Sequence, residues 1–273
     1  MLAKALVSEE LVDQFECDGA VCIREAVDAD IAASVLANID ALIADDNDRW
    51  TTIRSGGFSD RHLWPTTPWM YEFCANSRLP AIVGCLLESS EMRLFFDHIF
   101  VRDAGTQQDT PWHQDRAYWP FTGKQIASVW VALTACDEKS GAVRFVRGSH
   151  AWGKTFRPMS FIKEGGVSEF LEENAALEEI PDIDAAPDDY EFLHWDMQPG
   201  DAIVFSAEMV HGARENTDAS RRRAALSIRY IGDDARWDPK EGTDPIVTQD
   251  RVGIAPGEPP HDDRWFPLVW SAN

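Results

Sequence analysis

A histidine and an aspartate two residues apart, together with a distant second histidine, are the residues of this chain best suited to hold a metal. His113 and Asp115 lie in the segment Thr110–Asp115, and His211 precedes Gly212. Side chains alternate along a strand, so residues 113 and 115 share a face if the segment is extended. Two imidazoles and a carboxylate on one side of an ion, with other positions open, form the ligand set of non-haem Fe(II) oxygenases. We therefore predict these three residues as iron ligands. A core histidine and a turn aspartate are the alternatives.

Three consecutive arginines, Arg221 to Arg223, supply a candidate anchor for an anion. A 2-oxoglutarate cosubstrate that chelates iron through its keto acid needs a fixed fork of donors for its far carboxylate, and arginine provides one. Strand alternation puts Arg222 on the face of the following strand that carries large apolar residues, namely Leu226, Ile228 and Tyr230. We expect that face to point inward and predict Arg222 as the anchor. Arg223, on the other face, and a solvated basic run are the alternatives.

The spacing of apolar residues changes from helical to strand-like near residue 90. It predicts helices from Ser8 to about 18, from Asp28 or Asp30 to about 44, and over 79–87. Strands are expected at 20–23, 92–102, 126–134, 142–146, 202–205 and 224–231. Residues 54–69 are typical of a loop with tryptophan anchors. The pattern predicts one α+β, mainly β, domain over 1–273: a helical layer at about 8–88, a core at about 91–232 with an acidic insertion at about 160–192, and a packed tail at 233–273.

The charge balance narrows the class of partner. The 273 residues include 25 Lys and Arg against 47 Asp and Glu, a formal net charge of −22. So acidic a surface disfavours nucleic acid and anionic membranes, although it also serves solubility alone. If the mouth of the site shares this bias, a neutral or cationic small molecule is favoured. Five cysteines without a CxxC pair indicate reduced thiols, and no apolar run reaches 18 residues, so we expect a cytoplasmic monomer or homodimer without a membrane span.

Several segments, in this order, carry a resemblance to a known family. They are Thr110–Asp115, Val129–Leu133, Gly141–His150, Pro199–Asp201 and His211–Asn216 followed by Arg222. Over roughly residues 8 to 232 the chain resembles the phytanoyl-CoA dioxygenase family. The resemblance implies a double-stranded β-helix (jelly-roll, cupin-like) core with flanking N-terminal helices. It also implies dependence on Fe(II), 2-oxoglutarate and O2.

The same resemblance assigns roles to individual residues. It places the metal ligands at His113, Asp115 and His211, and the 2-oxoglutarate arginine at Arg222. Gln114 and Trp130 match positions that line the cosubstrate pocket in relatives. Halogenating relatives have a small residue in place of the carboxylate, so the presence of Asp115 favours hydroxylation.

The residues that select the substrate are less sharply indicated. Candidates follow the HxD motif or lie on the tryptophan-containing loop and the first long strand: Tyr118, Trp119, Phe121, Trp64, His98 and Arg116. Core packing is the alternative for the aromatic ones. We predict hydroxylation of a small molecule, and the net charge makes a CoA thioester a poor candidate. The alternatives are desaturation, cyclisation or epoxidation with the same cofactors, and a non-catalytic jelly-roll module that binds a ligand or a metal.

Overall fold

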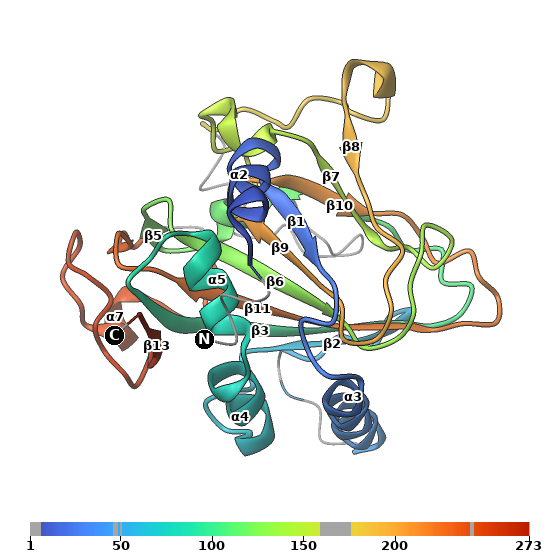
Figure 1. The fold of residues 1–273 in the computed structure, drawn as a ribbon, viewed down its shortest axis with the longest axis horizontal. Coiled ribbons are helices and arrows are strands. Elements are labelled where there is room, and N and C mark those ends of the chain that lie inside the picture. The colour runs from blue at the N-terminus through green and yellow to red at the C-terminus, as the bar shows by residue number, and fades with distance from the viewer. Residues whose placement is uncertain (1–6, 46–48, 50, 159–175, 241–242, 273) are drawn as a thin grey trace.

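The fold is a jelly roll of two antiparallel β-sheets with helices on one outer face (Figure 1). It is known from a computed structural model that describes residues 7–45, 49, 51–158, 176–240 and 243–272. The predicted fold class, a mainly β jelly-roll core with N-terminal helices, is confirmed. Within the described ranges no helix has the length and apolar character needed to cross a bilayer.

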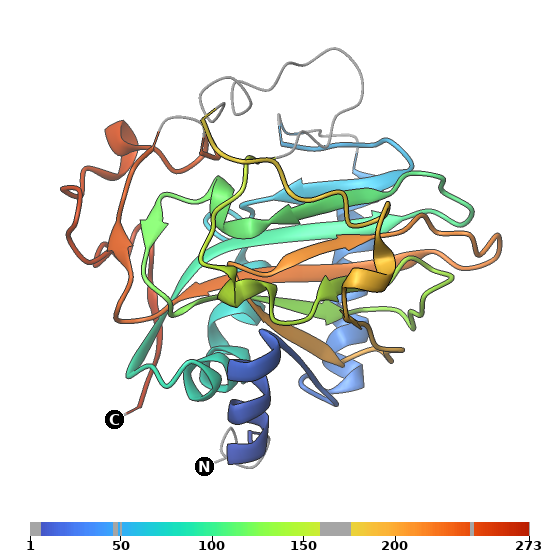
Figure 2. The same cartoon turned by 90° about the horizontal axis from the view of Figure 1, so that it is seen from above.

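The larger sheet has the order β1-β9-β6-β11-β3-β13, and β2 pairs with the second half of β3. Its strands are β1 Ala20–Ile23, β2 Gly57–Arg61, β3 Glu91–Arg102, β6 Ile126–Ala132, β9 Ala202–Ser206, β11 Arg223–Ile231 and β13 Leu268–Ser271. Five of these seven strands match predicted segments to within two residues. The short strands β2 and β13 were not predicted. Figure 2 shows the strands lying side by side.

The smaller sheet has the order β4-β10-β7-β8, and its strands are β4 Thr110–Gln114, β7 Val143–Val146, β8 Phe192–Leu193 and β10 Val210–Ala213. A two-stranded sheet joins β5 Phe121–Thr122 to β12 Arg236–Trp237. In the part of the chain that the structure describes, three 3-10 helices complete the connections: η1 Asp115–Tyr118, η2 Ser149–Trp152 and η3 Pro187–Asp189.

The helices are α2 Glu9–Asp18, α3 Ala29–Ala44, α4 Pro68–Asn76, α5 Leu79–Leu86 and α7 Gln249–Val252. The predicted start of α2 is confirmed, because the Ser8 hydroxyl caps the helix by accepting a hydrogen bond from the Leu11 amide at 3.3 Å. Gly19 ends the helix at φ 81°, a conformation that glycine adopts without steric cost. Residues 54–69 are not only loop, since they include β2 and the start of α4.

The larger sheet is buried on both faces. One face of β11 packs against α3, α4 and α5 through Leu226, Ile228 and Tyr230. The other face packs against the smaller sheet, where Ala225 joins a cluster with Trp130 and Phe145. We call the face turned toward the other sheet the inner face. Because both faces are covered, apolar character along β11 does not reveal which face is the inner one.

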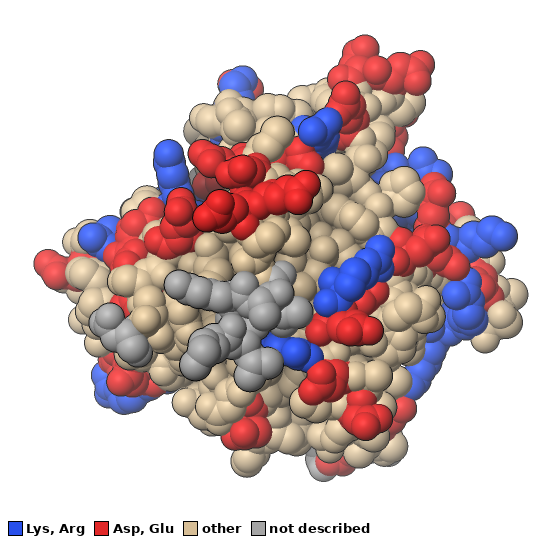
Figure 3. Space-filling view, viewed as in Figure 1, with Lys and Arg blue, Asp and Glu red and all other residues tan. Residues whose placement is uncertain are grey.

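The C-terminal tail packs at one end of the sheets (Figures 1 and 2). Trp237 and Phe266 are fully buried there, and β13 pairs with the first residues of β3. Residues 160–175 of the predicted acidic insertion lie outside the described residues. Figure 3 shows acidic side chains gathered over α2. The exposed acidic residues of that helix are Glu9, Glu10, Asp13 and Glu16.

Candidate metal centre

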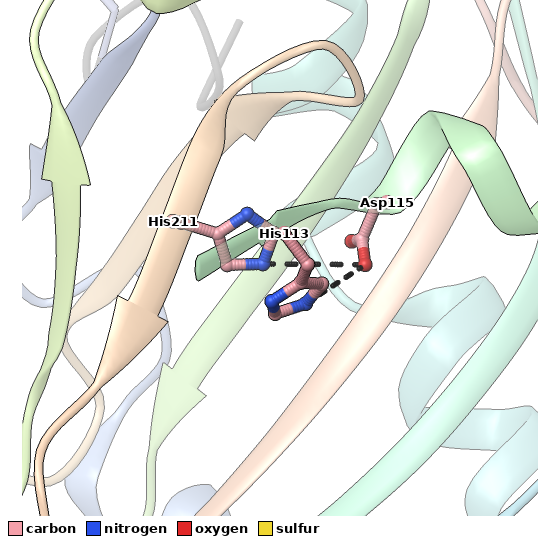
Figure 4. A group of neighbouring side chains, drawn as sticks. All are labelled: His113, Asp115 and His211. Carbon is pink, nitrogen blue, oxygen red and sulfur yellow. Dashed lines mark ion pairs between the residues drawn. The ribbon is translucent and has the colours of Figure 1, made fainter. Parts of the chain in front are cut away.

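Two neighbouring strands of the smaller sheet bring the two histidines together. β4 and β10 are antiparallel, and His113 lies directly opposite His211 in their register. β4 ends at Gln114, and Asp115 begins η1, so the carboxylate turns toward the imidazoles at the strand end (Figure 4). Gly212 permits this close pairing, because a Cβ there would lie 2.9 Å from the Thr110 carbonyl oxygen. Close packing of β10 against β4 therefore explains why a glycine follows His211.

The three side chains converge on one point (Figure 4). The Nε2 atoms of His113 and His211 lie 3.9 Å and 4.0 Å from the same Asp115 oxygen, Oδ1. One ligand atom from each residue lies within 4.8 Å of the others, and all three residues are buried. Atoms bound about 2.1 Å from a transition metal in neighbouring positions are roughly 3 Å apart. The two imidazole–carboxylate pairs each need to close by only about 1 Å to share one ion.

Both imidazoles are oriented for metal binding through Nε2. Nδ1 of His113 lies 2.9 Å from the Pro111 carbonyl oxygen, and Nδ1 of His211 lies 3.0 Å from that of Met209. A carbonyl only accepts, so each Nδ1 must carry the proton and donate it. This leaves the Nε2 lone pair directed at the shared point. In most proteins a metal-binding histidine is held by a hydrogen bond of this kind from its other ring nitrogen.

The protonation states of the three residues also suit a divalent cation. Burial lowers the pKa of His113 to about 3, with a further contribution from neighbouring His211. Burial likewise lowers the pKa of His211. For Asp115 burial favours the neutral acid, but Arg229, the imidazoles and Ser128 outweigh it and lower its pKa. Neutral imidazoles and an ionised carboxylate are the forms that bind metal.

Two residues that sequence reasoning did not select hold the other oxygen of Asp115. The Ser128 hydroxyl donates to Oδ2 at 2.6 Å, and a guanidinium nitrogen of Arg229 lies 3.8 Å from the same atom. Ser128 on β6 and Arg229 on β11 are direct partners across the larger sheet. A buried serine and a buried arginine at paired inner positions are a detectable signal, but only once the strand register is known.

The structure overturns the argument that selected Arg222. Its side chain is 39% exposed and forms an ion pair with Asp40 of α3, on the helical side of the sheet. Arg223 is the inner arginine and is only 3% exposed. The prediction was wrong because the apolar face of β11 is the one under the helices, whereas the inner face carries Arg223 and Arg229.

Arg223 has the surroundings expected of an anion anchor. Its guanidinium donates to the Gly141 carbonyl, lies 5.6 Å from the Trp130 ring centre, and keeps a buried Nε without a partner among the described residues. Trp130 belongs to the inner cluster with Phe145 and Phe205, whose rings both contact His211. Arg223 and Trp130 therefore lie on the His211 side of the centre.

Gln114 points away from the centre. Its amide nitrogen donates to the carbonyls of Lys154 and Glu208, and its amide oxygen accepts from the Phe156 backbone. The prediction that Gln114 lines the cosubstrate pocket is wrong, because neighbours along a strand face opposite sides and His113 occupies the inner one. Gln114 instead fixes the loop that follows η2.

The six substrate candidates separate into two groups. Tyr118, Trp119 and His98 lie near the centre. The Tyr118 ring is 6.2 Å from that of His113, Trp119 stacks on Arg229, and His98 lies on the inner face of β3 opposite Ser227.

The other three candidates lie elsewhere, contrary to the prediction. Trp64 is buried in the core under the helices, and its indole donates to the Phe95 carbonyl. Phe121 is buried beneath the C-terminal tail with Phe266. Arg116 is directed to Glu208 and to the carbonyl of Gly123.

A comparison with known families agrees with this architecture. The sequence profile described as Phytanoyl-CoA dioxygenase (PhyH) matches residues 15–224. The chain belongs to this family. Among curated members, a probable phytanoyl-CoA dioxygenase of Caenorhabditis elegans is 29% identical over 184 residues, which cover 64% of this chain and 55% of that protein. Peroxisomal phytanoyl-CoA dioxygenase of Rattus norvegicus is 26% identical over 181 residues, covering 64% and 49%. The match thus spans about half the length of these PhyH relatives.

Solved structures share the fold at greater sequence distance. The carbocyclase SnoK from nogalamycin biosynthesis, described as non-heme and alpha ketoglutarate dependent, has a TM-score of 0.71 at 20% identity, covering 97% of both chains. EctD from S. alaskensis with bound Fe has a TM-score of 0.72 at 18% identity, covering 93% of this chain and 87% of that one. These PhyH-like structures establish the jelly-roll fold of the present chain.

Proposed function

We propose that this PhyH-family protein is an Fe(II)- and 2-oxoglutarate-dependent oxygenase that hydroxylates a small molecule. One observation carries the proposal: His113, Asp115 and His211 converge with both Nε2 atoms turned to one carboxylate oxygen. Three protein ligands leave the remaining positions of an octahedral iron for the cosubstrate and dioxygen. The iron and 2-oxoglutarate named for the structural relatives support the same cofactors here.

Each residue then has a distinct task. His113, Asp115 and His211 would hold the iron, and Ser128 would keep the outer oxygen of Asp115 away from it. We assign the far carboxylate of 2-oxoglutarate to Arg223 rather than Arg222, with Trp130 beside it. Fe(II) with 2-oxoglutarate and O2 supplies the oxidising power to hydroxylate a C–H bond, and succinate and CO2 are the coproducts. The protein's own part is to position the substrate and keep water out of a centre whose ligands are 6–7% exposed.

The carboxylate ligand favours hydroxylation over halogenation, because Asp115 fills the position that a halide would need. A net charge of −22 disfavours a large polyanion such as a CoA thioester, despite the names of several relatives. Desaturation, cyclisation or epoxidation would use the same centre and remains the alternative outcome. SnoK, described as a carbocyclase, shows that this fold carries such chemistry.

The test measures succinate formed from 2-oxoglutarate by anaerobically iron-loaded protein after admission of oxygen. We expect slow formation without substrate and faster formation with the correct small molecule. His113→Ala should abolish it, and Arg264→Gln, a change at an 80% exposed side chain of the tail, is the matched control. Absence of succinate from the wild-type protein across a broad metabolite panel would favour a binding module and refute the proposal.

A further inference from the structure

A second buried arginine lies on the inner face of β11, six residues along the strand from Arg223. Arg229 is 6% exposed, and one of its guanidinium nitrogens is 3.8 Å from Asp115 Oδ2. Arg223 lies beside the Trp130 ring. Trp130 belongs to the same cluster as Phe145 and Phe205, whose rings contact His211. The two cations therefore lie at different places on the inner face, Arg229 beside Asp115 and Arg223 beside Trp130, which allows them separate tasks.

The guanidinium of Arg229 is poorly satisfied. It carries five N–H donors, and its hydrogen bond to the Ser227 carbonyl oxygen is 3.3 Å long. Among the described residues, neither its Nε nor the buried Ser227 hydroxyl has a hydrogen-bond partner. Leaving such donors buried without acceptors is costly. An acceptor supplied by a ligand would satisfy both groups, which lie two residues apart on the inner face of β11.

The surrounding wall is partly exposed and contains a second arginine. On the inner faces of β2 and β3, Ser59, Arg61 and His98 are half-exposed, whereas the residues between them are buried. His98 lies opposite Ser227, and Arg61 lies opposite His98, so these residues adjoin the Arg229 side of the centre. Asp244 accepts from Arg61 Nε at 3.0 Å and offsets part of this charge. Burial lowers the pKa of His98, and the cations Arg229 and Arg61 lower it further.

The rings of Trp119 and Phe96 fix the guanidinium in place. Their centres lie 5.8 Å and 6.0 Å from the Arg229 Cζ. A guanidinium packed against two aromatic rings suits bidentate recognition of a planar carboxylate. Asp115 provides the nearest negative charge, but a ligated metal would draw on that same carboxylate. Arg229 would then keep only its weaker electrostatic partners, Asp97 and Asp244, beside iron.

We propose that the primary substrate is a carboxylic acid whose carboxylate binds Arg229 on the Asp115 side of the centre. This inference rests on the proposed function. It replaces the expectation of a neutral or cationic substrate, because the buried group beside the centre that lacks an acceptor among the described residues is a guanidinium nitrogen, Nε of Arg229. Oxidation would take place a few bonds from the carboxylate, since Arg229 adjoins a metal ligand.

The test compares carboxylates with their uncharged amides. Binding of hexanoate against hexanamide, and of benzoate against benzamide, is measured by calorimetry under anaerobic conditions with the metal and saturating 2-oxoglutarate present. We expect the wild-type protein to prefer at least one of the acids by about tenfold or more. Arg229→Gln should remove the preference, and Arg264→Gln should leave it unchanged.

A second experiment tests whether Arg229 binds the carboxylate of the substrate or that of 2-oxoglutarate. The affinity for 2-oxoglutarate is measured for Arg229→Gln and Arg223→Gln. We expect less than a threefold change for the first and a large loss for the second. Equal losses would assign Arg229 to the cosubstrate and overturn the inference, as would equal binding of acids and amides by the wild type. If Arg229→Gln does not fold, Arg229→Lys keeps the charge without the fork and should reduce the preference at least threefold.

The controls also distinguish this inference from the proposed function. Failure of the wild-type protein to bind metal or 2-oxoglutarate refutes the function. If the wild-type protein binds metal and 2-oxoglutarate but binds acids and amides equally, only the substrate class is refuted.

Discussion

Replacing each of the two candidate arginines in turn gives the sharpest test of which one faces the candidate metal centre. Arg222 and Arg223 are adjacent, equally charged and equally long, yet one is 39% exposed in an ion pair with Asp40 and the other is 3% exposed beside Trp130. Arg222→Gln and Arg223→Gln therefore form a matched pair. Only the second should affect the binding of 2-oxoglutarate.

The magnitude follows from burial. Removing one partner of a buried, hydrogen-bonded charge pair costs about 2–5 kcal/mol, and every 1.4 kcal/mol is a factor of ten, so Arg223→Gln should weaken 2-oxoglutarate binding by roughly 30-fold to 3,000-fold. An exposed ion pair contributes about 0–1 kcal/mol to stability and nothing to a site on the other face of the sheet. Arg222→Gln should change the dissociation constant by less than about twofold.

The assay is anaerobic calorimetry of 2-oxoglutarate binding to the iron-loaded variants. Thermal unfolding is measured alongside, because Arg223→Gln also removes the hydrogen bond to the Gly141 carbonyl. A greater loss of affinity in Arg222→Gln than in Arg223→Gln would refute the assignment of the inner face. Arg223→Lys, which keeps the charge but not the fork, should fall between the wild type and Arg223→Gln.

Three further predictions concern the centre and its support. Ser128→Ala removes the 2.6 Å hydrogen bond to Asp115 and should lower iron affinity by about 10- to 100-fold in equilibrium dialysis without changing the fold; unchanged affinity would show that the bond does not position the carboxylate. The pKa values of His113 and His62 are about 3 in the folded protein, lowered chiefly by burial, against about 6.5 in the unfolded chain. The unfolded state therefore takes up protons that the folded state does not, and the free energy of unfolding of metal-free protein should fall as the pH drops from about 6.5 to 4, by up to about 1.4 kcal/mol per pH unit for each histidine. Denaturant titrations at several pH values should show this slope, and His62→Gln should reduce it; a flat profile would contradict the burial of these groups. Gly212→Ala places a Cβ 2.9 Å from the Thr110 carbonyl oxygen and should cost about 1–3 kcal/mol of stability and weaken iron binding, whereas preserved stability and affinity would show that β10 can shift freely.

The sequence by itself determined most of the elements and singled out the three residues that the structure brings together as a candidate metal centre. The serine cap and the glycine at residue 19 delimit α2, and apolar spacing locates α3, α5 and the long strands to within two residues. His113 and Asp115 are neighbours in the chain, so local geometry alone places their side chains near each other. The partner histidine was identifiable because its glycine and the following turn form a motif. Trp130, which the family resemblance also named, lies on the inner face beside Arg223.

Only the tertiary structure decided which residues face the centre from the larger sheet. β11 is covered by helices on one face and by the smaller sheet on the other, so the apolar residues at 226, 228 and 230 point away from the site rather than into it. The same ambiguity misassigned Arg222 and left Ser128 and Arg229 unnoticed, since their proximity to Asp115 depends on strand register across the sheet. Trp64, Phe121 and Gln114 illustrate the same limit: their types suit a binding site, but layer packing directs them elsewhere. The spacing of apolar residues predicts that a side chain is buried. Only the arrangement of the sheets and helices determines what it is buried against.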